Sequence, residues 1–463
     1  MKDTRRKLNL YTIFDFPKIE KSLEKMALEG WMLYEAKGNF WKYQRMEPKK
    51  LRFSVMFLPK VSAFDPEPTE QSADLADFAS RTGWKHVASA SMMQIFCNEN
   101  PDAIPMETDP IVQVDTIHNT VKKNLLWSWV ILMLVSFMNV AIRFTTVGDN
   151  FTNFITDRTQ LLMVLCWAVI ALESLFHVVS YYLWYKKAKA EAENGEFIRP
   201  RSNMMAYYSI LAVLFALSLW LTFEMYSTLN AKFILYIFGY MAVIFGIVWG
   251  LIKMLKSIKM PGKYTIIIVY IIGTVVSFVI IGGLIHLILG NNDHVDPAAA
   301  GTYEHNGRLI EYYLDEIPLR VEDMEDVDYE HYSTRNEKKS SIFASMSEIR
   351  QRDRIGDNKP DLEYIIVDVK IPLVYDMILR DIIAKRDETD DEYAPEGHKQ
   401  IYEEIDGSEW CADKAYQLVS QEFGGIDHYI LCYDNRIVEM VFYDFSPDTD
   451  DKLIAGEKLM AYN

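Results

Sequence analysis

The stretch LLWSWVILMLVSFMNVAI at residues 125–142 contains eighteen residues without a charged side chain. A helix rises about 1.5 Å per residue, so this stretch can cross the roughly 30 Å hydrocarbon core of a bilayer. Further apolar runs lie at about 160–184, 205–227, 233–252 and 264–289. The sequence therefore predicts a multi-pass α-helical membrane protein with five spans.

The distribution of Lys and Arg predicts the direction of the spans. Two connecting segments, 185–204 and 253–263, are rich in these residues, and the alternate connections contain few. Because such loops stay in the cytoplasm, we expect a cytoplasmic N-terminus and an extracytoplasmic C-terminus in the cell membrane. About 120 mostly polar residues precede the first span, which is typical of an internal anchor rather than a signal peptide.

Charge is divided unevenly along the 463 residues. Residues 1–290 carry 24 acidic and 30 basic side chains, whereas residues 291–463 carry 41 acidic and 18 basic ones. An acidic C-terminal third cannot supply the basic patch of a nucleic-acid binder, so no direct nucleic-acid contact is expected. The four cysteines form no CxxC pair, which argues against a structural zinc site. We predict neither a metal nor a cofactor.

A weak internal repeat organises residues 1–110, and its marker is a helix that ends in Gly-Trp. The first copy reads as strand 11–16, helix 18–30 and strands 31–38 and 40–46. The second reads as strand 51–57, helix 73–83 and strands 84–90 and 93–99. Two β-α-β-β units predict one cytoplasmic α+β domain with helices on one face of an antiparallel sheet. The other sheet face would be free to bind a partner.

Trp31 and Trp84 occupy matching positions in the two copies. Packing at the corner between helix and strand is the main interpretation, and ligand stacking is the alternative. The domain has no phosphate loop, nucleophile elbow or His-rich cluster, so a binding or dimerisation module is expected rather than an enzyme, with no catalytic residue assigned.

The segments FDFPKIEKSLEKMALEGW (14–31), FWKYQRM (40–46) and FASRTGWKHV (78–87) resemble the bacterial domain-of-unknown-function family DUF2812. EIPLRVEDM at 316–324 is similar to a segment of its longer members. The resemblance implies a membrane protein of Gram-positive bacteria, often encoded near PadR-type transcriptional regulators. It implies no catalytic residues.

Four ionisable residues lie within the predicted spans: Glu173, His177, Glu224 and His286. Such groups are unfavourable in the membrane and usually face the bundle interior. Together they could bind zinc or relay protons, but their unequal depths argue against one compact site. The alternative is a structural Glu173–His177 pair, with Glu224 and His286 reaching the interface.

Small residues form a stripe on the fourth predicted span, at Gly239, Ala242, Gly246 and Gly250. Such a stripe allows close helix packing or a homo-oligomer contact.

We expect a linker at 111–124 before the spans. After the spans we expect an acidic stalk at 290–340 and an extracytoplasmic α+β domain at 341–463. The apolar runs 362–371 and 428–443 predict strands, the second being a hairpin that turns at Asp434 and Asn435. Helices are expected at about 372–386, 409–423 and 449–460. Cys411 and Cys432 could form a disulfide that joins a helix to a strand.

A sensor or regulatory protein, coupling the two soluble domains, is the leading functional prediction. Its cytoplasmic partner would be a PadR-type regulator or a transporter subunit. The alternatives are a transporter accessory or export component, and a membrane hydrolase that uses Glu173 and His177. The hydrolase ranks last because the sequence has no HExxH or similar paired motif.

Overall fold

The computed structural model describes residues 4–462 apart from 10, 12, 37, 39, 60, 62, 63, 91, 201–203, 229, 230, 291–298, 306, 307, 328–331, 354–359, 388–399 and 421–423. Side chains are described except at 13, 124, 146–149, 204–207, 221, 224–228, 231–237, 281, 284–290, 305, 308, 309, 386 and 387. The chain forms two compact units, Met1–Asn139 with Cys166–Ile288, and Val140–Leu165 with Leu289–Asn463.

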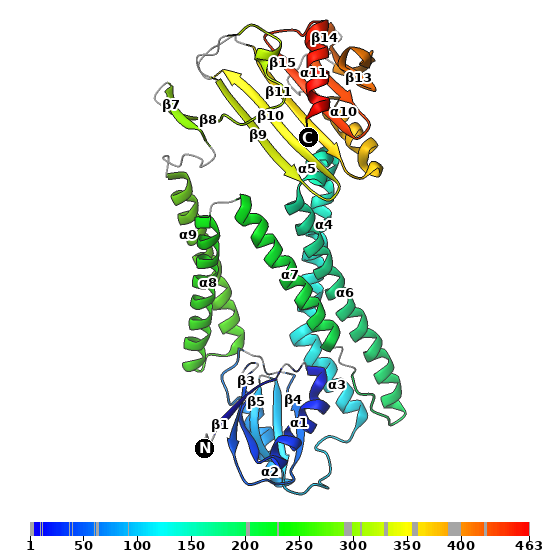
Figure 1. Cartoon of the computed structure of the whole chain (residues 1–463). Coiled ribbons are helices and arrows are strands. Elements are labelled where there is room, and N and C mark those ends of the chain that lie inside the picture. Colours follow the sequence, from blue (N-terminus) through cyan, green and yellow to red (C-terminus); the bar gives the residue numbers. More distant parts are fainter. Residues whose placement is uncertain are drawn as a thin grey trace. The chain divides into compact units, whose positions relative to one another are not determined.

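The N-terminal domain contains the two predicted β-α-β-β copies (Figure 1). The first comprises β1 (Thr4–Leu8), α1 (Phe16–Leu28), β2 (Trp31–Glu35) and β3 (Phe40–Arg45). The second comprises β4 (Arg52–Phe57), α2 (Glu70–Arg81), β5 (Lys85–Ala90) and β6 (Met93–Asn98). Gly30 and Gly83 follow the helices with φ of 81° and 82°, a conformation that side chains rarely adopt, so glycine ends both helices.

Two details of this domain differ from the prediction. Each copy forms its own three-stranded antiparallel sheet, ordered β1-β3-β2 and β4-β6-β5, instead of contributing to one sheet. Residues 13–15 form a 3-10 turn that leads into α1, and the first strand is Thr4–Leu8. Pro17 explains the second difference, because its fixed φ suits the first turn of a helix.

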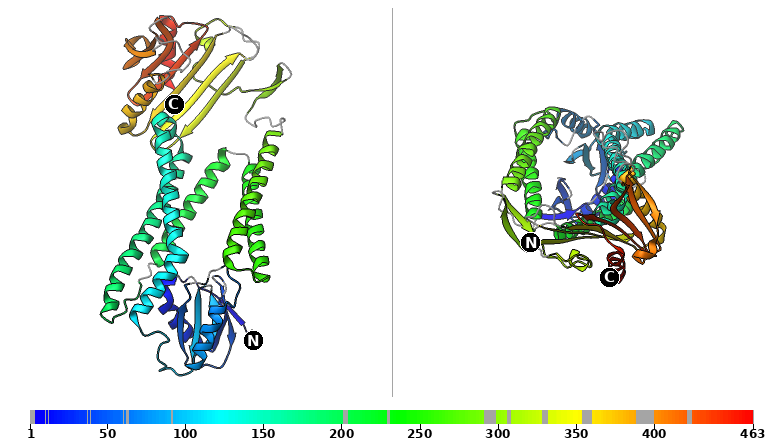
Figure 2. Two further views of the ribbon diagram at one scale, coloured as in Figure 1. Left: turned by 180° about the vertical axis from the view of Figure 1, so that it is seen from behind. Right: turned by 90° about the horizontal axis from the view of Figure 1, so that it is seen from above.

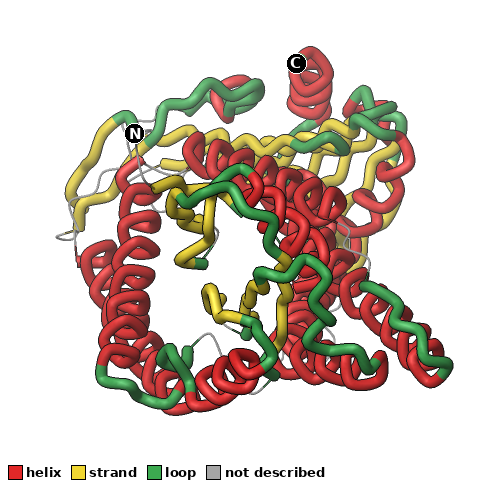
Figure 3. The backbone as a smooth tube through the Cα atoms, turned by 90° about the horizontal axis from the view of Figure 1, so that it is seen from below, coloured by secondary structure: helices red, strands yellow, loops and turns green. Residues whose placement is uncertain are grey.

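The middle of the chain is helical, and no strand occurs among the described residues between Asn98 and Gly301 (Figure 3). The predicted linker at 111–124 is helical as well. The helices are α3 (Pro110–Val121), a π-helical turn (Lys122–Leu126), α4 (Trp127–Asp149), α6 (Arg158–Glu193), α7 (Met204–Thr228), α8 (Ala231–Ser257) and α9 (Gly262–Gly290).

Four described helical segments are long and apolar enough to cross a membrane, which indicates a membrane-associated multi-pass protein. They are Trp127–Thr145, Arg158–Glu193, Phe238–Ser257 and Gly262–Ile280. The predicted span at 205–227 falls on α7. The described apolar segment of this helix is Tyr208–Trp220, which is shorter than the other four. A fifth span is therefore not confirmed.

The C-terminal domain is built on a seven-stranded antiparallel sheet, ordered β12-β13-β14-β15-β11-β10-β9. Its strands are β9 (Tyr332–Ser340), β10 (Ala344–Asp353), β11 (Asp361–Val369), β12 (Gln400–Ile405), β13 (Lys414–Ser420), β14 (Gly424–Cys432) and β15 (Arg436–Tyr443). A separate hairpin pairs β7 (Gly301–His305) with β8 (Arg308–Tyr312).

Helices cover both faces of this sheet (Figure 2). One face packs on α10 (Tyr375–Asp387) and on the short helix α5 (Phe151–Thr156), which connects α4 to α6. The other packs on α11 (Thr449–Ala461). In β11, Tyr364 and Ile366 face the α11 side, and Val367 faces the α10 side. Burial on both faces explains the almost continuous apolar run of this strand.

The hairpin at 428–443 and the helices near 372–386 and 449–460 are confirmed by β14, β15, α10 and α11. The helix predicted at 409–423 is wrong, because Lys414–Ser420 is the strand β13, paired on both sides. The stalk predicted at 290–340 is also wrong in extent. Leu319 is fully buried in the core, and β9 is a strand of the main sheet. The segment is acidic, but the apolar side chains spaced along it are enough to form these core contacts.

Candidate functional site

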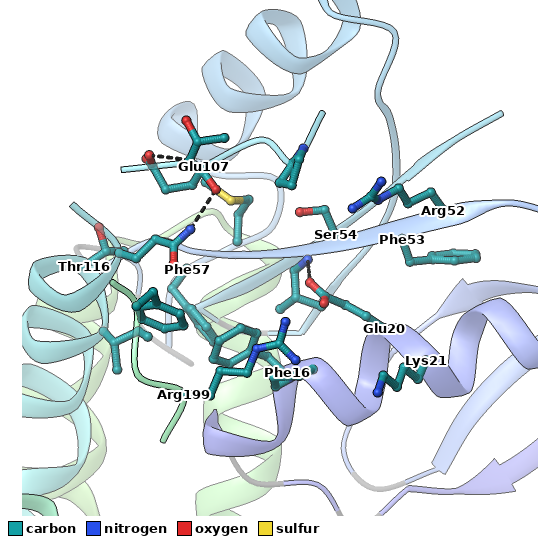
Figure 4. A pocket seen from close by; sticks show the side chains of 18 of the residues that line it. Phe16, Glu20, Lys21, Arg52, Phe53, Ser54, Phe57, Glu107, Thr116 and Arg199 are labelled. Atoms are coloured by element: carbon teal, nitrogen blue, oxygen red, sulfur yellow. Dashed lines mark hydrogen bonds between the residues drawn. The ribbon is translucent and has the colours of Figure 1, made fainter. Parts of the chain in front are cut away.

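A pocket of about 580 Å³ lies in the N-terminal unit beside α1 and β4 (Figure 4). Three phenylalanine rings form one wall. The ring centroid of Phe16 is 5.7 Å from that of Phe57 and 6.5 Å from that of Phe197. Charged side chains complete the lining, namely Glu20, Lys21, Glu24, Arg52, Glu107 and Arg199. The site therefore combines an apolar wall with groups of both charges.

Helix α1 lies along the free edge of β4. The Val55 N–H donates to Oε1 of Glu20 at 2.9 Å, and the Phe53 N–H donates to Oε1 of Glu24 at 3.5 Å. Four residues of helix advance about 6 Å, and two residues of strand advance about 6.7 Å, so the two carboxylates match alternate N–H groups. The glutamates thereby cover an edge that another strand could otherwise pair with.

Burial raises the pKa of Glu20 to about 7. The Val55 N–H opposes this rise, Glu24 adds to it, and Arg199 and Arg52 oppose it. A carboxyl group with this pKa exists in both protonation states near neutral pH. It can therefore either accept or donate a hydrogen bond to a bound molecule.

Three cations line the same pocket. Within the described chain, Lys21, Arg52 and Arg199 form no ion pair with a carboxylate, although Arg52 donates to the Pro101 carbonyl at 3.4 Å. Guanidinium groups bind carboxylates and phosphates in a bidentate manner. No His or Cys is among the described lining residues. The chemistry suits binding of an anionic group beside an apolar one.

The pocket wall includes segments that continue into the long helices. Gln113 and Thr116 belong to α3, which runs through the π-helical turn into α4. Phe197 and Arg199 belong to the connection between α6 and α7, and Figure 4 shows Arg199 beside Phe16 of α1. A molecule in the pocket would therefore touch the N-terminal domain, α3 and the connection between α6 and α7.

Two further contacts attach the N-terminal domain to the helices. His118 of α3 hydrogen-bonds through Nδ1 to the Tyr181 hydroxyl at 2.7 Å and stacks on Tyr185, both on α6. The Gly262 N–H at the start of α9 donates to Oδ1 of Asp65 at 2.7 Å. An acidic side chain at a helix N-terminus is electrostatically favourable.

The matching tryptophans have different surroundings. Trp84 is buried, with 2% of its surface exposed, and lines the pocket. Trp31 is only partly buried, and the guanidinium carbons of Arg5 and Arg45 lie 5.8 and 5.1 Å from its ring centroid. The repeat therefore preserves the position of the residue but not its environment.

Glu173 and His177 lie on one face of α6. Nε2 of His177 is 2.9 Å from Oε1 of Glu173, and the His177 ring stacks on Trp129 of α4 with centroids 5.1 Å apart. Both side chains are partly buried, at 24% and 16% exposure for His177 and Glu173. Among the described residues, no group of three or more His, Cys, Asp or Glu side chains could hold a metal ion.

Replacing Glu173 by alanine is expected to destabilise the protein by about 1–3 kcal/mol, because the contact between Glu173 and His177 is lost. Glu173→Gln should retain most of the stability, since an amide oxygen can still accept. Thermal unfolding in detergent measures both, with Glu193→Ala at the exposed end of the same helix as control. Equal losses for alanine and glutamine would contradict a packing role for the pair.

The remaining predicted positions are two ionisable residues of the spans, the stripe of small residues and the cysteine pair. The side chains of Glu224 and His286 lie outside the described residues. Gly239, Gly246 and Gly250 have open space where a Cβ would stand, and Ala242 is also exposed, so the stripe faces no helix of the described chain. Cys411 and Cys432 are both free thiols, and Cys411 ends a 3-10 turn instead of lying on a helix.

The pocket residues were not singled out from the sequence. The available signals were the spacing of Glu20 and Glu24 on one helix and the alternation of Arg52 and Ser54 with apolar residues in β4. Neither signal says that α1 lies along β4, so the pocket could not be assembled from them.

Residues 15–130 match the family model described as protein of unknown function (DUF2812). No curated protein and no solved structure matches the chain. The matched region contains both Gly-Trp landmarks, at Gly30-Trp31 and Gly83-Trp84, whereas 316–324 lies outside it. The resemblance inferred from the sequence is therefore confirmed for the N-terminal region, where residues 15–130 form a DUF2812 domain.

Proposed function

We propose that this protein is a non-enzymatic membrane sensor or regulatory protein in which the N-terminal pocket is the binding site. The observation that carries the proposal is the origin of the pocket wall. Residues of α3 and of the connection between α6 and α7 line the pocket together with α1 and β4. Occupancy of the pocket would therefore act directly on segments that continue into the apolar helices.

The C-terminal domain supports the same proposal from within its own unit. Helix α5, between α4 and α6, contributes Ile155 to the core of this domain. The boundaries between the two units fall within α4 and α6, so each of these helices belongs partly to both units. A change in either domain has a covalent route to the other.

The membrane arrangement that we propose is five spans with a cytoplasmic N-terminus and an extracytoplasmic C-terminus. The positive-inside pattern and the helix α7 at the third predicted span, 205–227, support it. The partner at the N-terminal domain would be a PadR-type regulator or a transporter subunit, and the second of these would make the protein a transporter accessory.

Filling the pocket tests the coupling. Ser54→Trp places an indole in the pocket, and hydrogen–deuterium exchange of the full chain in lipid nanodiscs reports the effect. We expect at least a two-fold change in exchange rates in residues 150–157, and none for Ser80→Trp on the exposed face of α2. If the change stays within residues 1–130, the coupling proposal is wrong.

A pull-down from gently solubilised membranes tests the partner. The intact chain is compared with a variant that lacks residues 1–110, with mass spectrometry of the retained proteins. A regulator or transporter subunit retained only by the intact chain supports the proposal. Retention that is independent of the domain would contradict a binding role for it.

A further inference from the structure

We propose that the C-terminal domain rests on the lipid surface on its own side of the membrane through one apolar patch. The patch consists of Ile342, Ile371, Leu373 and Met377, with exposed fractions of 72%, 37%, 84% and 50%. The partner is the bilayer itself. This inference goes beyond the proposed function and does not depend on what the N-terminal pocket binds.

Backbone contacts hold the patch together. Ile342 lies in the turn between β9 and β10, and Ile371 and Leu373 lie between β11 and α10. The N–H groups of Lys370 and Ile371 donate to the Phe343 carbonyl at 2.8 and 3.3 Å. The two turns therefore form one surface rather than two separate loops.

The same surface is attached to α5. The Ser341 hydroxyl donates to the Ile155 carbonyl at 2.5 Å, and Nζ of Lys339 is 3.5 Å from Oδ1 of Asn153. Ser341 is 4% exposed, so its contact with α5 is internal to the domain. Figure 1 shows α5 at the end of the sheet where β9 turns into β10.

The chain fixes the depth of α5 in the membrane. Helix α5 ends at Thr156, and the apolar run of α6 begins at Leu161. Asp157 between the two helices is extended, and Arg158 to Leu161 rises by three helical steps, so the separation is about 8 Å at most. The headgroup layer on each side of the hydrocarbon core is about 5–8 Å thick. Helix α5 therefore lies at the headgroup layer, and the patch beside it lies at the same level.

Basic side chains border the patch. Nζ of Lys370 donates to the Ser340 hydroxyl at 2.7 Å and to the Ser341 carbonyl at 2.8 Å, next to Ile342. Lys339 precedes the turn that holds Ile342 by three residues, Arg380 follows Met377 by three residues on α10, and Asp376 is the acidic residue on the first turn of α10. Cations beside apolar side chains are typical of interfacial membrane contacts. They stand out in a region with 41 acidic and 18 basic residues.

Site-directed spin labelling of the full chain in vesicles tests the inference. Labels are placed by Ile342→Cys and Leu373→Cys, and by Leu453→Cys and Met460→Cys on α11 as matched exposed controls. The partly exposed Cys166 and Cys411 are replaced by serine, and the buried Cys97 and Cys432 are retained. Vesicles contain phosphatidylcholine with or without phosphatidylglycerol.

Power saturation distinguishes lipid from water, because oxygen partitions into the bilayer and a nickel chelate stays in water. We expect the ratio of oxygen to nickel accessibility to be at least three-fold higher at 342 and 373 than at 453 and 460, and higher still with anionic lipid. Equal ratios at all four sites would overturn the proposal. Low accessibility to both reagents at 342 and 373 would mean that protein covers the patch, which would also overturn it.

Discussion

Asp381→Ala is expected to destabilise the C-terminal domain by about 3–5 kcal/mol, because one side chain holds the start of α5. The Asp381 carboxylate accepts the Phe151 N–H at 2.9 Å, the Thr152 N–H at 2.8 Å and the Thr152 hydroxyl at 2.5 Å. Its side chain is 6% exposed. Alanine would leave these donors without a partner, two of them buried in the core.

A neighbouring charge adds to the expected loss. Nζ of Lys385 lies 3.5 Å from Oδ2 of Asp381 and is 31% exposed, so it would lose its counterion in a partly buried site. Asp381→Asn keeps one oxygen acceptor and should lose less than alanine. Thermal unfolding in detergent measures the loss, and hydrogen exchange at 150–157 should rise in parallel.

The matched control for this variant is Asp376→Ala, at an exposed position of the same helix. Its effect should stay below about 1 kcal/mol, since only a charge in the first helical turn is removed. If Asp381→Ala and Asp376→Ala have equal stability, the attachment of α5 through Asp381 contributes nothing.

Glu20→Gln should make the stability of the N-terminal unit less dependent on pH. The pKa of Glu20 is raised from 4.5 to about 7 in the folded protein, so the folded state binds more protons than the unfolded state between these values. Stability must therefore fall as pH rises through this window. One pKa unit corresponds to about 1.4 kcal/mol, so the ionised carboxylate costs about 3 kcal/mol at pH 8.

Glutamine keeps an acceptor for the Val55 N–H but carries no charge. Glu20→Gln should therefore be more stable than the parent at pH 8, with the difference disappearing near pH 4.5. Melting temperatures at both pH values check this, and Glu29→Gln, at an exposed position just after α1, is the control. A gain that is equal at both pH values would contradict the raised pKa.

Several elements followed from the sequence because short-range patterns determine them. Apolar runs without charges predicted the long helices, and four of them are present as candidate spans. The Gly-Trp repeat predicted two β-α-β-β copies. This prediction held because a glycine with positive φ ends a helix through its own backbone conformation, which does not depend on distant parts of the chain. The run 428–443 turned at Asp434 and Asn435 because turn residues separate two apolar strands.

The errors arose where partners override local preference. Residues 414–420 have no strong local signal, and pairing with β12 and β14 makes them a strand. Leu319 and Val321 stand among acidic residues, yet both are completely buried. A charged segment can belong to a core when its few apolar side chains all point to one side.

The two contacts on which these predictions rest depend on tertiary structure alone. Glu20 meets Val55 across 35 positions of chain, and Asp381 meets Thr152 across 229. The sequence by itself determined the apolar helices, the repeat and the family. Which carboxylate meets which N–H was decided only by packing, because a hydrogen bond depends on the position of both atoms and the sequence pattern describes each segment separately.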